Sequence, residues 1–292
     1  MAKSKTGGSR AYIRGRIGSD VYSIGKDGKG KKQQVVRSLA ESVANPQTQA
    51  QMIGRMIMST IAQAASALRP IIDHAFDNVS GRQPNISEFT RLNYALIKAD
   101  YEAHPSSGNA FGLNKYQEKG IKAGAYQVSK GDLIVPAGVA AATNKAALEI
   151  TLPENTVTVG ALREVLAGLS VEGYITLVAI DTDVHAARYV RASLDTDLPD
   201  ATTITSSNVA SLFALEGNDA GAVSLTNNVI EITFTDWRFC GSQGIIISDK
   251  VSGQWKHSTC VLKAGSSAAW PGATALPTYP QGENFYLNGG DL

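Results

Sequence analysis

Cysteine is scarce in this chain, whose 292 residues include only Cys240 and Cys260. Two cysteines are too few for a disulfide scaffold, and neither has a partner at the Cys-x-x-Cys spacing of zinc sites. Two alternatives stay open: one disulfide between neighbouring strands, or two buried free thiols. We favour the thiols, because a free cysteine packs as a small hydrophobic side chain.

Long apolar runs are also missing. No segment approaches the run of about 20 apolar residues that crosses a membrane. The polar N-terminal segment lacks the apolar stretch of a signal peptide. We therefore expect no membrane partner.

Catalytic motifs are absent as well. The four histidines are scattered, and there is no His-Glu-x-x-His, Gly-x-Ser-x-Gly, P-loop or dinucleotide-binding glycine motif. We expect no enzymatic activity, no catalytic residue, no cofactor and no bound metal.

Two clusters of acidic residues could hold a metal ion. Asp181, Asp183 and His185 alternate just past a buried strand, which would place them on one face and could suit a divalent ion. A second group, which could hold Ca²⁺ weakly, consists of Asp195, Asp197 and Asp200. We favour a solvated strand end and an ordinary polar loop, because no second ligand cluster is visible.

Charge is low in total but unevenly distributed. Charged residues make up 18% of the chain, and the net charge is +1. Residues 1–37 hold ten Lys and Arg against Asp20 and Asp27, a net +8, so the remainder carries −7. The pattern is that of a basic arm on a mildly acidic body.

The basic arm is expected to contain one β-hairpin. Residues 1–11 are rich in Gly, Ser and Lys, so we expect them to be disordered until something binds them. Strands at 21–24 and 34–37 flank a glycine-rich, Lys-rich segment that supplies the turn. The expected contact residues are Arg14, Arg16, Lys26, Lys29, Lys31 and Lys32. They could bind nucleic acid without sequence specificity, or clasp the acidic body of a neighbouring subunit, which we favour.

A helical region follows at 45–123. Asn45-Pro46 predicts a helix start, and Pro70 predicts a kink or restart. After a loop at 80–85, a second helix is expected at 86–101, with Phe89, Leu92 and Leu96 on its apolar face. The short loop suggests an antiparallel pair.

The third region, 124–263, reads as β-rich. Expected strands lie at 125–128, 133–135, 147–152, 174–180, 186–194, 223–225, 229–234, 240–248 and 254–262. Short helices are expected at 159–169 and 208–215. The apolar run at 174–180 predicts a strand that is buried on both faces, and many short strands indicate a sandwich or small curled sheet.

The last region, 264–292, is rich in Gly, Pro, Ser and Ala. Its aromatic residues, which a merely disordered tail usually lacks, are Trp270, Tyr279, Phe285 and Tyr286. We expect them to dock on this chain or on a neighbour as oligomer contacts. The fold class is thus α+β, with domains at 1–44, 45–123, 124–263 and 264–292.

One part of the chain resembles a known family. The matching residues are Val36-Arg37-Ser38, Val43, Asn45-Pro46, Thr48, Gln51 and Arg55, with a weaker late-strand match at Ser252-Gly253-Gln254-Trp255 and Ser258. They resemble the signature of a family of uncharacterised proteins from Bacteroidota and their bacteriophages, whose members typically end in a β-sandwich-like domain. The family has no established activity, so the resemblance implies none, but it favours a phage or mobile-element particle protein.

Together these observations predict a phage virion structural or assembly protein, a capsid, connector or tail component. It would form a symmetric homo-oligomer through its terminal arms, beside other virion proteins, in the virion or the host cytoplasm. The alternative is a non-specific nucleic-acid-binding protein that uses the basic N-terminal region.

Overall fold

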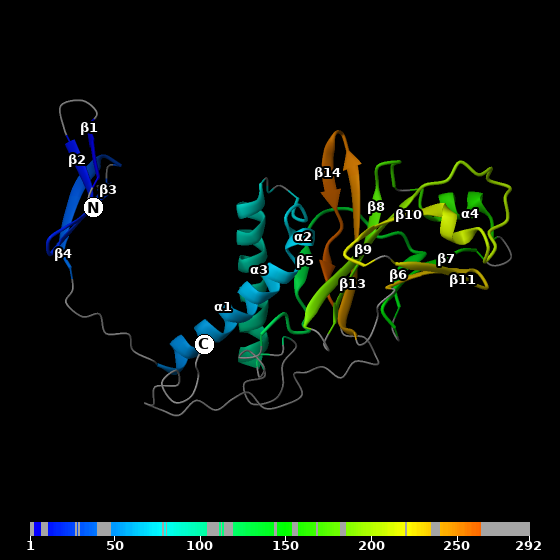
Figure 1. The fold of residues 1–292 in the computed structure, drawn as a ribbon, viewed down its shortest axis with the longest axis horizontal. Helices are drawn as coiled ribbons and strands as arrows, with labels where there is room; N and C mark the ends of the chain where they lie inside the picture. The colour runs from blue at the N-terminus through cyan, green and yellow to red at the C-terminus, as the bar shows by residue number, and fades with distance from the viewer. Residues whose placement is uncertain are drawn as a thin grey trace. The chain divides into compact units, whose positions relative to one another are not determined.

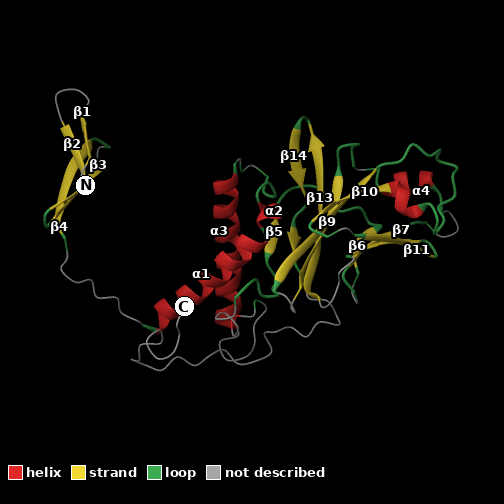
Figure 2. Cartoon of the chain, in the orientation of Figure 1, coloured by secondary structure: helices red, strands yellow, loops and turns green. Residues whose placement is uncertain are grey.

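The computed structural model divides the chain into two units, Met1–Gln47 and Thr48–Leu292 (Figures 1 and 2). The described residues are 3–6, 11–26, 28, 30–39, 48–77, 79, 81–103, 111, 113, 119–142, 145–153, 157–167, 169–181, 185–219, 221–234 and 240–263. The order of helices, then sheets, after an N-terminal β unit confirms the predicted β-rich α+β class.

The N-terminal unit is a four-stranded antiparallel sheet in the order β1-β2-β3-β4. Its strands are β1 (Lys3–Thr6), β2 (Ala11–Ile17), β3 (Asp20–Lys26) and β4 (Lys32–Ser38). The predicted hairpin is confirmed as β3 and β4. The expectation of disorder over 1–11 is wrong for β1, because its backbone pairs with β2.

The turn between β2 and β3 explains how this sheet extends beyond the predicted hairpin. Ile17 pairs with Asp20, so Gly18 and Ser19 form a two-residue loop. Gly18 has a φ of 58°, a left-handed conformation that such turns require and that glycine adopts without strain.

Helix α1 (Gln49–Ala67) opens the second unit. Its N-cap is Thr48, whose hydroxyl accepts a hydrogen bond from the Gln51 N–H at 3.4 Å. The prediction that Asn45 caps this helix is therefore wrong. Asn45-Pro46 itself lies outside the described residues. The predicted restart at Pro70 is confirmed, because α2 (Arg69–Ile72) begins there, and proline fits a first helical turn.

Helix α3 (Arg82–Ala103) begins earlier than predicted. The expected loop at 80–85 is wrong from Arg82 on, since Pro84 lies in the first turn, where no N–H is required. The buried face consists of Asn85, Phe89, Asn93 and Ile97. Leu96, predicted to be apolar core, is exposed. Helix α1 contacts α3 and crosses it obliquely, so the two do not form the expected antiparallel pair (Figure 1).

Among its described residues, the rest of the second unit contains antiparallel strands and two short helices. The strands are β5 (Gln127–Ser129), β6 (Val139–Ala141), β7 (Ala147–Thr151), β8 (Tyr174–Asp181), β9 (Ala186–Leu194), β10 (Phe213–Gly217), β11 (Ala222–Thr226), β12 (Val229–Thr233), β13 (Cys240–Val251), β14 (Gln254–His257) and β15 (Cys260–Val261). The short helices are α4 (Val159–Val165) and a 3₁₀ helix, η2 (Val209–Leu212).

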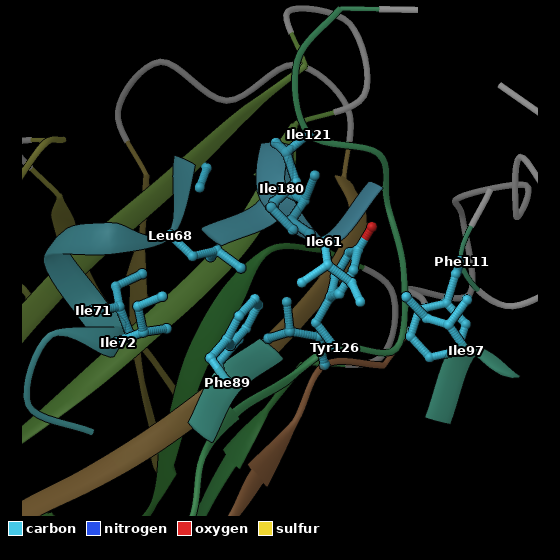
Figure 3. Packing of buried hydrophobic residues seen from close by; sticks show 14 of the residues in the cluster. Ile61, Leu68, Ile71, Ile72, Phe89, Ile97, Phe111, Ile121, Tyr126 and Ile180 are labelled. Carbon is cyan, nitrogen blue, oxygen red and sulfur yellow. The ribbon is translucent and has the colours of Figure 1, made fainter. Parts of the chain in front are cut away.

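A five-stranded sheet, β10-β9-β8-β13-β14, forms the middle layer. On one face, alternate residues such as Ile175, Ile245 and Ile247 pack against the four-stranded sheet β11-β12-β7-β6 and α4, which makes the predicted sandwich. On the other face, Ile180 and Ile246 join the core beneath α1, α2 and α3. Figure 3 shows this second core, in which Ile61 and Phe89 lie beside Tyr126.

Several strand predictions are confirmed, and the strands expected at 133–135 and 254–262 are wrong in whole or in part. Strands β7, β8 and β9 agree with prediction, and the predicted hairpins turn at residues with positive φ, Asn227 (56°), Ser252 (52°) and Gly253 (79°). No strand forms at 133–135, where Ile134 is almost fully exposed. The short β6 was not predicted, 208–215 is half 3₁₀ helix and half strand, and 254–262 breaks into β14 and β15, the latter pairing with β5.

Candidate functional site

The predicted basic contact residues lie on the N-terminal sheet. Arg14 and Arg16 are exposed in β2, and Lys26 ends β3. Lys32 begins β4, and Lys31 directly precedes it. All of these side chains are exposed, whereas Lys29 lies outside the described residues. Lys26 pairs in register with Lys32, so the hairpin end is basic as expected.

The strand register separates two kinds of surface. Arg16 pairs with Val21, and Val21 pairs with Arg37, so these residues share one face of the sheet with Arg14, two residues along β2. No acidic residue occupies that face among the residues with described side chains. We call it the arginine face.

The opposite face of the same sheet carries an apolar group, which the register places beside Asp20, Gln34 and the Lys26–Lys32 pair. Ile17, Tyr22, Ile24 and Val36 share it by register. Ile17, Ile24 and Val36 are 48%, 38% and 51% exposed, and none of the described side chains of this unit is buried. A small sheet needs a covered apolar face to be stable on its own. We call this surface the isoleucine face.

Sequence reasoning named the arginines but missed the face they share. The signal was present in residues 11–17, where apolar and basic residues alternate with the period of two that marks a strand. The high Gly, Ser and Lys content of the segment before them masked it.

The Asp181, Asp183 and His185 group does not form the expected single face. Strand β8 ends at Asp181, and His185, with a φ of 51°, lies in the connection to β9; Asp183 lies outside the described residues. The buried Asp181 carboxylate faces the Arg188 guanidinium at 3.3 Å, and Arg188 also faces the buried Asp219 at 3.3 Å. Asp181 therefore belongs to a buried ionic triad, and the favoured expectation of a solvated strand end is wrong for this residue. Across the described ranges, no three His, Cys, Asp or Glu side chains could hold a metal ion.

The carboxylates of the acidic loop, in contrast, are exposed, as expected of a polar loop. Asp195 and Asp197 are exposed, and Asp200 forms an ion pair with Arg163 of α4. The Asp200 carboxylate thus anchors the loop to a helix.

Cys260 is a free, buried thiol, so the alternative of a Cys240–Cys260 disulfide is wrong. Burial raises the pKa of Cys260 to about 12. The Cys240 side chain lies outside what the structure describes, as do Trp270, Tyr279, Phe285 and Tyr286.

Comparison of the chain with models of protein families, with curated proteins and with solved structures finds no match. Among the described residues, no helix is long and apolar enough to cross a membrane.

Proposed function

We propose that this chain is a structural subunit of a phage particle, a capsid, connector or tail component that assembles into a symmetric homo-oligomer. The observation that carries the proposal is the isoleucine face, whose Ile17, Ile24 and Val36 are partly exposed and lack full cover within the described part of their own sheet. A sheet with this much apolar surface gains about 25 cal/mol for each Å² that a partner covers. A second copy of the same sheet is the simplest partner, since an isologous contact pairs one patch with itself.

The size of the sheet limits what it can do alone. Three of its strands have seven residues each. Three such strands and the four-residue β1 would cover roughly 400 Å² on one face, so face-to-face pairing would remove about 800 Å² from water. A specific interface usually clears about 1,000 Å². Further contacts are therefore required, and we propose that Trp270, Tyr279, Phe285 and Tyr286 supply them, each able to bury about 150–250 Å².

The resemblance to phage proteins and the basic arm on an acidic body support placement in a particle, in the virion or in the host cytoplasm during assembly. Particle purification followed by mass spectrometry tests that placement. Absence of the chain from every particle fraction would refute it.

The assembly surface has a matched pair of test variants. Val36 lies on the isoleucine face, and its neighbour Val35 lies on the arginine face at 36% exposure. Val36→Glu should lower the apparent association constant, measured by light scattering, at least ten-fold. Val35→Glu should leave that constant nearly unchanged. Deleting residues 1–47 should act like Val36→Glu, because both hydrophobic cores lie within the second unit. If all three proteins assemble like the parent chain, the N-terminal sheet is not the interface.

A second candidate function, non-specific nucleic-acid binding, is favoured by the arginine face. Arg14, Arg16 and Arg37 share that surface without a described acidic neighbour. Phosphate contacts release counterions, so each one should add about 0.9 to the slope of log affinity against log salt. Replacing the three arginines with Gln should remove that slope, and Lys26→Gln with Lys32→Gln is the matched control on the other face. Lack of binding at low salt rules this function out.

A further inference from the structure

A cavity of about 340 Å³ lies on the helix-facing side of the five-stranded sheet. Pro70 and His74, in and after α2, form one wall, and residues of β8, β9, β13 and β14 form the rest. In register, Arg191 pairs with Thr176, and Tyr174 pairs with Ser248, so these four side chains project from the same face into one space. The volume falls within the range of about 300–1,000 Å³ for small-molecule sites.

Arg191 is the cation of this cavity, and it is held in place from three sides. Its guanidinium carbon lies 5.4 Å from the Tyr174 ring centroid and 5.3 Å from that of Tyr189. Its Nη2 donates a hydrogen bond to the Pro70 carbonyl at 3.0 Å. Both rings and the carbonyl fix the guanidinium without neutralising its charge.

The hydrogen-bonding capacity of Arg191 is incompletely used. Its Nε is buried and has no hydrogen-bond partner. Within the described part of the chain, Arg191 forms no ion pair. A buried donor on a charged group costs free energy until an acceptor reaches it. The guanidinium is thus suited to receive an oxyanion from outside.

The other lining residues complete an aromatic, non-acidic site. Trp255 is 44% exposed, and its ring centroid lies 5.4 Å from that of Tyr174. Among the described residues that line the cavity, none is acidic, and His257 is held by a 3.0 Å hydrogen bond with Ser248. The nearby Asp77 accepts from the His257 main-chain N–H and pairs with Lys256 at 3.5 Å, so it does not neutralise Arg191.

We infer that this cavity is a binding site for a carboxylate carried on a six-membered ring that presents an apolar face. The carboxylate would accept hydrogen bonds from Arg191, whose planar fork matches its geometry. The ring would lie against Trp255 and Tyr174, which offer flat apolar surface at the mouth. Two sources share this chemistry, an acidic sugar and an aromatic acid. The inference does not depend on the proposed assembly function.

Isothermal titration calorimetry on the full chain tests the site with paired probes. Glucuronate and benzoate carry the carboxylate on a sugar ring and an aromatic ring, and glucose and benzyl alcohol are their uncharged counterparts. We expect at least one acid to bind at least ten-fold more tightly than its counterpart, and the acid that binds identifies the source. Inorganic phosphate reports on the cation without the ring.

Two variants assign the binding to these residues. Arg191→Gln should weaken the acid at least ten-fold, and Trp255→Ala, at a half-exposed position that should tolerate change, should weaken it about five-fold. Lys250→Gln is the control, because that nearby cation is already paired with Glu172 at 2.8 Å. Absence of binding by both acids overturns the inference. Equal binding of phosphate, or binding unchanged in Trp255→Ala, overturns the role of the aromatic wall.

Discussion

The side-chain amide of Asn93 pairs with the main chain of Gln127 as a neighbouring strand would. Asn93 accepts from the Gln127 N–H at 2.9 Å and donates to the Gln127 carbonyl at 3.0 Å. It also donates to the Phe89 carbonyl at 2.9 Å. One fully buried side chain thus joins α3 to the start of β5.

Asn93→Leu should destabilise the second unit by about 1–3 kcal/mol, because it removes the partner of two partly buried main-chain groups of Gln127. Urea unfolding followed by circular dichroism measures the change. Leu96 lies three residues further along the same helix and is exposed, so Leu96→Gln should change stability by less than about 0.5 kcal/mol. Similar effects of the two substitutions would contradict this role for Asn93.

The buried triad predicts an asymmetry between ion pairs. Arg188→Met would remove the guanidinium that two buried carboxylates, those of Asp181 and Asp219, both face, at a cost of about 3–5 kcal/mol. Arg91→Gln removes an exposed pair with Glu88 and should cost less than about 1 kcal/mol. Chemical denaturation of both variants decides the point, and an Arg188 variant as stable as the Arg91 variant would show the triad to be dispensable.

Cys260 should be chemically inert in the native protein. The thiolate is the reactive form, and a pKa raised to about 12 by burial leaves almost none of it at neutral pH. In a Cys240→Ser protein, the remaining thiol should react with a disulfide reagent only after urea is added. Rapid modification of the native Cys240→Ser protein would mean that Cys260 is accessible.

His257 should make stability depend on pH in the weakly acidic range. Desolvation lowers its pKa below 6.5, although Asp77 opposes the shift. The unfolded chain therefore binds this proton more readily than the folded chain, so the stability is fully present above about 6.5 and falls as pH drops below it. Urea midpoints at pH 7.5 and 5.5 should differ more for the parent chain than for His257→Gln. An equal difference in both proteins would assign the effect to other groups.

The sequence predicted correctly those helices and strands whose own residues have the matching propensity and burial pattern. Pro70 correctly marked the restart of a helix, and the continuous apolar run of β8 correctly marked a strand that is buried on both faces. The hairpin turns at Asn227 and Gly253 followed from the need for positive φ.

The predictions failed where the burial of a side chain or the pairing of a strand does not follow from the local sequence. Asn85 and Asn93 occupy the buried face of α3, so hydrophobic periodicity pointed to Leu96 instead. The pairing of β15 with β5 joins segments far apart in sequence, which no local pattern reports. For the candidate site, the basic residues could be named from composition, but the division of the sheet into two faces required its register.

The five-stranded sheet separates the two hydrophobic cores and contributes side chains to both. Ile246 belongs to the core under the helices, whereas Ile245 and Ile247 belong to the sandwich core. Neither core can melt without exposing one side of β13, so heat should remove both in a single calorimetric transition. A methylene deleted on either side, as in Ile246→Val or Ile247→Val, should lower the temperature of that same transition. Among the described residues, the N-terminal sheet contributes none to either core. If subunits associate as proposed, its melting should depend on that association rather than on the heat stability of the five-stranded sheet.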